Sequence, residues 1–173
     1  MSTVAVVSQY IPPDQDIMEQ LREISAYSGQ NYEGANTFKK SEAFSQLIIN
    51  LVGQMNDNVC LVEYLNFNQE LLTIRFFIDR GRQQVLAESI IGNSLVTGSQ
   101  GIVILRNRKS GAAMPKLHDR QLIRYLLSGL KILGTSLLDY IINREGQIYS
   151  AQEVGILKNG VETDNLGDHY SAI

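Results

Sequence analysis

A polar loop that follows an apolar run carries the side chains best suited to chemistry in this chain. The run is Gly101–Leu105, and the cations of the loop and of the turn behind it are Arg106, Arg108, Lys109 and Lys116. Asp119 then opens a long amphipathic segment. This order predicts a strand, a loop and a helix, with the loop at the carboxyl end of the strand. Ligands of α/β proteins commonly bind at that position.

Four cations beside the start of a helix favour an anion as the ligand. The amino end of a helix adds partial positive charge, so a carboxylate, a phosphate or a nucleic-acid backbone suits such a site. The nearest aromatic residue, Tyr125, falls on the apolar side of the helix, so binding without recognition of bases is expected. A structural alternative stays open, in which Asp119 pairs with Arg106 or Arg108 and closes the site.

The sequence lacks the residues needed for nucleophilic catalysis, for a disulfide and for a phosphate-binding loop. Ser110 has no neighbouring base and Cys60 lies in an apolar run, so neither is a candidate nucleophile. The single cysteine also excludes an internal disulfide and a zinc site made of several cysteines. Residues 92–100 are rich in glycine but lack the Gly-Lys-Ser/Thr ending of a phosphate-binding loop.

The periodicity of apolar residues predicts the elements that position the loop. Strand patterns cover Ser2–Ser8, Val59–Phe67, Leu71–Asp79, Gln83–Ile91, Gly101–Leu105, Ser136–Ile142 and Gln147–Ser150. Helical patterns cover Asp14–Ser28, Ser41–Met55 and Leu117–Leu133. The three runs between residues 59 and 91 predict an antiparallel meander, and residues 92–100 a loop. The fold class is therefore α/β, or α+β with a mixed sheet.

The last predicted helix has one apolar face, which we expect to pack on the sheet. Its members are Leu122, Tyr125, Leu126, Gly129, Leu130 and Leu133. Residues 58–157 are predicted to form the core. Residues 1–57 add a strand and two helices that pack on it, and residues 158–173 form an extended or disordered tail.

Charge is segregated along the chain, whose net charge is −3. Residues 75–131 carry 10 basic and 3 acidic residues, whereas residues 1–74 carry 3 and 9, and residues 132–173 carry 2 and 6. The basic block either marks an anion-binding face or pairs with the acidic ends. No apolar run approaches the ~20 residues of a membrane span, and the first residues lack a secretory signal. A cytoplasmic protein without a membrane segment is expected.

Residues 101–155 resemble the RadC-like branch of the JAB/MPN metalloprotease superfamily. The family's first strand ends in His-Asn-His-Pro-Ser-Gly, where this chain has Arg106-Asn-Arg-Lys-Ser-Gly111. The next motif, Pro-Ser-x-x-Asp, corresponds to Pro115-Lys-Leu-His-Asp119. A later Val-Leu-Asp-His-Ile-Ile corresponds to Leu137-Leu-Asp-Tyr-Ile-Ile142, and the spacing is kept without a gap. The resemblance implies a cytidine-deaminase-like sheet flanked by helices.

In the family, two histidines and the aspartate of these motifs hold zinc, and an upstream glutamate activates the bound water. Arg106 and Arg108 stand at the histidine positions and Lys116 at that of a serine, while Ser110 and Asp119 are retained. Glu70, or less favourably Glu63, stands at the glutamate position. Because a guanidinium has no free lone pair, we expect neither a metal nor another cofactor.

The resemblance therefore predicts an inactive relative of zinc metalloproteases that serves as a protein-interaction or scaffold module. Its partner would be another protein or a second copy, and no membrane. The alternatives are a nucleic-acid-binding or other anion-binding protein and, less favoured, a zinc-dependent isopeptidase-like hydrolase with rearranged ligands. The resemblance also predicts that a family helix between Asn93 and Gln100 is missing, with the helix at Ser41–Met55 in its place.

Overall fold

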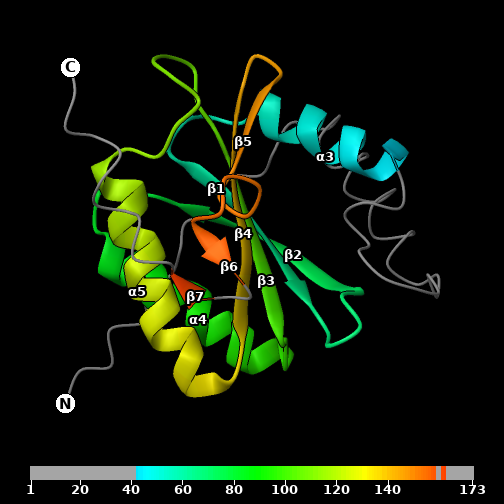
Figure 1. Ribbon diagram of the computed structural model, residues 1–173, viewed down its shortest axis with the longest axis vertical. Helices are drawn as coiled ribbons and strands as arrows, with labels where there is room; N and C mark the ends of the chain where they lie inside the picture. The colour runs from blue at the N-terminus through cyan, green and yellow to red at the C-terminus, as the bar shows by residue number, and fades with distance from the viewer. Residues whose placement is uncertain (1–41, 159–160, 163–173) are drawn as a thin grey trace.

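The computed structural model describes residues 42–158 and 161–162, with side chains from residue 48 to residue 157. The expected strand at Ser2–Ser8, the helix at Asp14–Ser28 and most of the predicted tail lie outside these residues. The described part forms a sheet with helices on both faces (Figure 1). This arrangement confirms the predicted α/β class with a mixed sheet.

Five strands form the main sheet in the order β2-β1-β3-β4-β5. Their bounds are β1 Val59–Leu65, β2 Leu71–Ile78, β3 Gly101–Asn107, β4 Ser136–Arg144 and β5 Gln147–Ser150. Only the pairing of β3 with β4 is parallel, and the other three pairings are antiparallel. A separate two-stranded sheet joins β6 (Leu157–Lys158) to β7 (Val161–Glu162).

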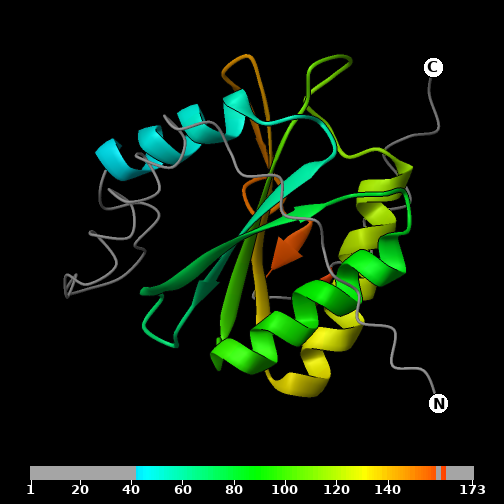
Figure 2. The same cartoon turned by 180° about the vertical axis from the view of Figure 1, so that it is seen from behind.

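Helices α4 (Gln83–Thr97) and α5 (Leu117–Leu133) cover one face of the sheet, and α3 (Glu42–Gln54) covers the other (Figures 1 and 2). Alternation along the strands supplies each face with apolar side chains. In β1, Val62 and Tyr64 point toward α4 and α5, whereas Leu61 and Leu65 point toward α3. Among the described residues, no helix is both long and apolar enough to cross a membrane.

The meander predicted between residues 59 and 91 is wrong in its third run. Val59–Phe67 and Leu71–Asp79 do form an antiparallel hairpin, but Gln83–Ile91 begins helix α4, which continues through most of the predicted loop. A short run of apolar and β-branched residues does not separate strand from helix by itself. The buried positions of α4 recur at helical spacing, and Gly98 ends the helix in the left-handed conformation, with φ 65°.

Helix α4 also corrects the expectation of a missing helix. It connects β2 to β3, and its last residues, 93–97, fall in the stretch that was expected to hold no helix. Helix α3 packs on the opposite face, against Leu61, Val103 and Ile141 among others, and fills no vacant place. In α5 the buried apolar residues are Leu122, Ile123, Leu126 and Leu130. Tyr125 and Leu133, which we expected on that face, are exposed.

Candidate functional site

The polar loop lies at the edge of the sheet where β2 and β3 end and β1 begins. Antiparallel pairing places Arg106, near the end of β3, opposite Cys60 in β1, and Cys60 opposite Phe77 in β2. Asp79, two residues beyond Phe77, therefore comes close to Arg106. Asp119, in the first turn of α5, reaches the same place from the side of the helix. The site is thus assembled by the sheet register and the start of α5.

Asp119 is the centre of a buried ion-pair network. Its carboxylate is fully buried and accepts bonds from Nη1 of Arg106 at 3.2 Å and from Nη2 of Arg108 at 2.7 Å. The Tyr140 hydroxyl and the backbone N–H of Lys116 also donate to it, each at 2.7 Å. The pairing of Asp119 with an arginine, which the sequence left as an alternative, is confirmed for both arginines.

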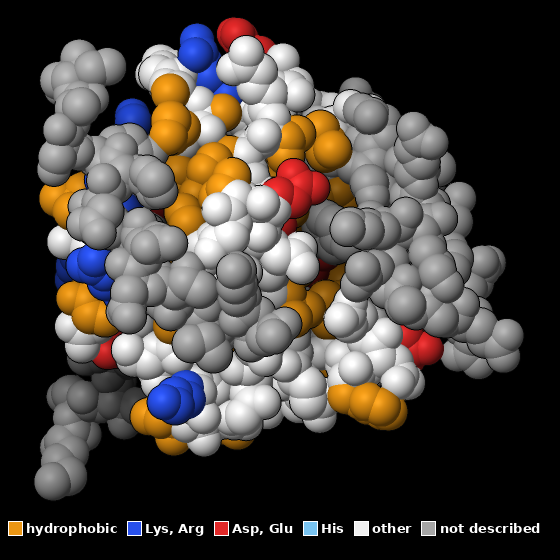
Figure 3. Space-filling model, viewed as in Figure 1, with side chains coloured by type: hydrophobic (Ala, Val, Ile, Leu, Met, Phe, Trp, Pro, Cys, Tyr) orange, Lys and Arg blue, Asp and Glu red, His pale blue; other side chains and the backbone are white. Residues whose placement is uncertain are grey.

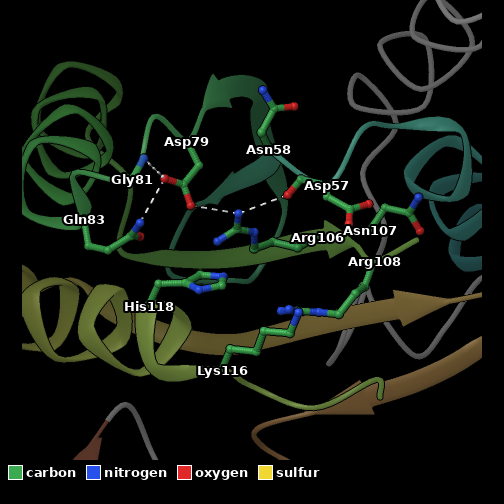
Figure 4. Close-up of a pocket in the computed structure, with 10 residues that line it drawn as sticks. All are labelled: Asp57, Asn58, Asp79, Gly81, Gln83, Arg106, Asn107, Arg108, Lys116 and His118. Atoms are coloured by element: carbon green, nitrogen blue, oxygen red, sulfur yellow. Dashed lines mark hydrogen bonds and ion pairs between the residues drawn. The ribbon is translucent and has the colours of Figure 1, made fainter. Parts of the chain in front are cut away.

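The other nitrogen of Arg106 is engaged as well. Its Nη2 donates to Oδ2 of Asp79 at 2.9 Å and to the carbonyl oxygen of Asp57 at 3.2 Å (Figure 4). Burial by itself raises the pKa of the Asp79 carboxyl, but the Gly81 N–H and the Arg106 guanidinium outweigh it and hold this pKa below its usual value. Arg106 is therefore held between the carboxyl groups of Asp79 and Asp119.

Tyr140 contributes a neutral donor to the network. Burial raises the pKa of its phenol well above the usual value, so the hydroxyl keeps its proton and donates it to Asp119. The side chain lies on the same face of the sheet as Arg106, because Tyr140 pairs with Ile104 in the parallel register of β3 and β4. Four donors to one carboxylate leave it little capacity for a further ligand.

A cleft of about 320 Å³ opens beside this network (Figure 4). Its lining consists of Asp57, Asn58, Asp79, Gly81, Gln83, Arg106, Asn107, Arg108, Lys116 and His118. Of the four predicted anion-binding residues, three therefore line one cleft. Lys109 is exposed outside it, where its Nζ donates to Asn56 at 2.9 Å and its backbone N–H to Asp57. Ser110 is also exposed and takes no part in the network.

Glu70 is not part of the site. It lies in the turn between β1 and β2, where its carboxylate accepts a bond from Asn66. This turn is at the end of the sheet where β3 begins, whereas Arg106 is near the end of β3. Glu63 is buried in the middle of β1, in a strand position that faces α3 rather than the cleft. The structure therefore places neither glutamate beside Asp119.

Sequence reasoning missed two members of the network, Asp79 and Tyr140. Both were read as strand residues, and only the pairing register brings them to Arg106. A polar group next to the end of an apolar strand was the available signal for Asp79. The hydroxyl of Tyr140, in an otherwise apolar stretch of β4, gave a similar hint because such a group needs a partner when buried.

The side chains of the site do not fit zinc, the ion that the family resemblance implies. Asp119 already accepts from two guanidinium groups, which repel a dication and offer it no lone pair. His118 lies 3.5 Å from Asp119, and a protein site for zinc uses at least three ligands. Within residues 42–158, no three His, Cys, Asp or Glu side chains are grouped to hold a metal ion.

Cys60 should be inert toward thiol reagents in the folded protein. Its thiol is fully buried beside Arg106, and burial raises its pKa to about 12, so the reactive thiolate is scarce. We expect no labelling by a maleimide or a disulfide reagent under native conditions and complete labelling in denaturant. Rapid labelling of the native protein would show that the thiol is accessible and would contradict this assignment.

Comparison with known proteins agrees with the resemblance seen in the loop. A family model described as a RadC-like JAB domain matches residues 38–156, well over half of the chain. A UPF0758 protein of Bordetella petrii is 28% identical over 101 residues, which cover 57% of this chain and 44% of that protein. A UPF0758 protein of Methanococcoides burtonii is 31% identical over 68 residues, or 39% of this chain and 30% of the relative.

A third relative, a UPF0758 protein of Methanosarcina mazei, is 29% identical over 69 residues, covering 40% of this chain and 30% of its own length. The matched part of this chain therefore spans less than half the length of these curated relatives.

Proposed function

We propose, from the premise that this chain belongs to the family of RadC-like JAB domains, that it is a non-catalytic member that works by binding another protein. The observation that carries the proposal is the paired ion bridge from Arg106 and Arg108 to Asp119. Two guanidinium groups occupy the positions where the family resemblance places zinc-binding histidines. Without a metal there is no activated water, and hydrolysis of the family type has no nucleophile.

The same ion pairs count against an anion as the ligand. A polyanion is held by cations that can exchange a counterion for a phosphate. Here Arg106 has two carboxylate partners and Arg108 has one, and both side chains are buried. Of the four predicted cations, only Lys109 and Lys116 are exposed. This balance favours a protein partner over a nucleic acid as the class of ligand.

Metal content tests the loss of catalysis directly. We expect the chain, purified without chelators from cells grown with zinc, to contain far less than one zinc per chain by elemental analysis. The double variant Arg106→His/Arg108→His should gain zinc, because two imidazoles and Asp119 then complete a three-ligand set. Adding Asp119→Asn to that variant should remove the metal again. One zinc per chain in the unmodified protein would overturn the proposal.

Binding of labelled duplex and single-stranded DNA tests the anion-binding alternative. We expect no binding at physiological salt. Binding that weakens with salt and is lost in Lys109→Ala/Lys116→Ala would instead support an anionic ligand. The substitution Arg75→Ala, at an exposed position of β2, serves as the control for a general loss of positive charge.

A further inference from the structure

Helix α4 exposes apolar side chains on a face that nothing in the described chain covers. Val85, Leu95 and Val96 are 41%, 67% and 86% exposed. Val96 follows Val85 by eleven residues, about three turns, and so lies on the same side of the helix, with Leu95 on the adjacent side. Glu88 is the helix's single charged residue. The buried residues of α4 lie on its inner side, so the outer face, which also carries the exposed Gln84 and Glu88, leaves these three apolar side chains in contact with solvent.

Helix α5 extends this apolar face. The two helices lie side by side (Figure 2), with Ile91 of α4 against Gly129 of α5. The hydroxyl of Ser94 in α4 also lies 3.4 Å from that of Thr135, just beyond the end of α5. Tyr125 and Ile132 share the side of α5 that carries Gly129, and they are 44% and 85% exposed. We call the surface formed by Val85, Gly92, Leu95, Val96, Tyr125 and Ile132 the α4–α5 surface.

We infer that the α4–α5 surface binds a second copy of this chain, with the two α4 helices crossing at Gly92 about a two-fold axis. A side-chain carbon added at Gly92 meets no atom within 4 Å, so the backbone is open to close approach there. In a dimer with a two-fold axis, the same surface of each copy contacts that of the other. A bare position in the middle of an apolar helix face lets the two backbones meet without a clash.

Charge on this surface is compatible with a copy of itself. The basic residues Arg124 and Lys131 lie on another side of α5, and basic side chains are spread along the edge of the molecule that α5 forms (Figure 3). Glu88 is the charge that each copy contributes. In an antiparallel crossing at Gly92, the two Glu88 residues are offset along the axis by about 12 Å, since each residue rises 1.5 Å. That separation exceeds the screening length of about 10 Å at moderate salt.

The apolar area of the α4–α5 surface can be compared with the area that known interfaces bury. Five large side chains that are two-fifths to nine-tenths exposed leave roughly 500 Å² of apolar area, toward the upper end for a monomer. Two such faces bury on the order of 1,000 Å², at the lower limit for a specific interface. A surface of this size suits a weak, reversible dimer, and we expect its dissociation constant to fall in the micromolar range. This inference goes beyond the proposed function, because it concerns another face and stands whether or not the cleft holds a metal.

Sedimentation velocity over a concentration series tests the dimer. We expect the unmodified chain to shift from monomer to dimer in the micromolar range. Gly92→Leu should keep the chain folded, since the position is open, and should leave it monomeric over the same range. Val96→Glu should also give a folded monomer, and it provides the test if Gly92→Leu does not fold. Phe67→Glu, at an equally exposed apolar position in the β1–β2 turn, should dimerise like the unmodified chain.

Cross-linking tests the position of the axis. Gly92→Cys adds a thiol at the proposed crossing point, and mild oxidation should convert most of the dimer into a disulfide-linked species. Cys60 does not compete because it is buried. Glu153→Cys, in an exposed loop, should stay uncross-linked at the same concentration. A chain that stays monomeric, a dimer that survives Gly92→Leu, or one that Phe67→Glu disrupts equally would overturn the inference.

Discussion

Replacing Asp119 with asparagine should lower the free energy of unfolding by about 3–5 kcal/mol, the usual effect of removing one partner from a buried ion pair. Asp119 is fully buried and receives four donors, two of them guanidinium groups. An amide is neutral and has a single acceptor oxygen, so Arg108 loses its carboxylate and Arg106 one of two. Urea unfolding followed by circular dichroism measures the change.

The substitution Asp139→Asn is a matched control for Asp119→Asn. Asp139 accepts bonds from Ser150 at 2.6 Å and from the Gln152 N–H at 2.9 Å, but forms no ion pair with any described residue. Loss of its charge should cost about 1.5–3 kcal/mol, the range for hydrogen bonds to a charged group. If the two variants lose equal stability, the ion pairs with the arginines add nothing to the contribution of Asp119. The central role of the network is then refuted.

Glu63→Gln should remove a pH dependence of stability that the unmodified chain shows between pH 4.5 and about 8. Glu63 is buried in β1 between Ile74 and Val103, and its Oε1 has no hydrogen-bond partner within the described residues. Burial raises the pKa of this carboxyl from 4.5 to about 8. The folded protein therefore holds it as the neutral acid at neutral pH.

The sign of the effect follows from where the proton is bound. Below pH 4.5 the carboxyl is protonated in both states, so its contribution to stability is fully present. As pH rises toward about 8, only the unfolded chain ionises. Stability then falls by about 1.4 kcal/mol per pH unit. Relative to the unmodified chain, Glu63→Gln should gain roughly 3–5 kcal/mol over this interval.

Chemical unfolding at several pH values measures this difference. Glutamine does not reproduce every contact of the protonated acid, so the variant and the unmodified chain can differ in stability at any pH. The test is therefore how this difference in stability changes with pH, not its value at one pH. Glu153→Gln, at an exposed position, should track the unmodified chain at every pH. A difference that stays constant for Glu63→Gln would show that Glu63 ionises alike in both states, as it would if it were solvated.

The two variants probe opposite faces of the sheet. Asp119 belongs to the face covered by α4 and α5, where charges are paired. Glu63 belongs to the face covered by α3, where its buried carboxyl has no ion-pair partner among the described residues. The same sheet thus carries a stabilising ionic network and a destabilising buried acid. The changes in unfolding free energy caused by substitutions at sites more than about 7–10 Å apart, without shared partners, usually add. The double variant should therefore show the sum of both changes.

Much of the fold was predictable from the sequence because its signals are local. Runs of apolar and β-branched residues marked β1, β2 and β3, and the stripe of α5 together with Gly134 marked that helix and its end. Helix α4 was not predictable in this way. Its apolar residues are distributed around the whole helix, so no periodicity distinguished the helix from a strand.

The sequence by itself determined the order of strand, polar loop and helix and the cations of the loop. These are properties of neighbouring residues. Only the tertiary structure decided that the arginines are neutralised by carboxylates, because Asp79 and Asp119 reach them from β2 and α5. The charge state of a site depends on distances between residues far apart in the chain, and those distances exist only once the sheet register is set.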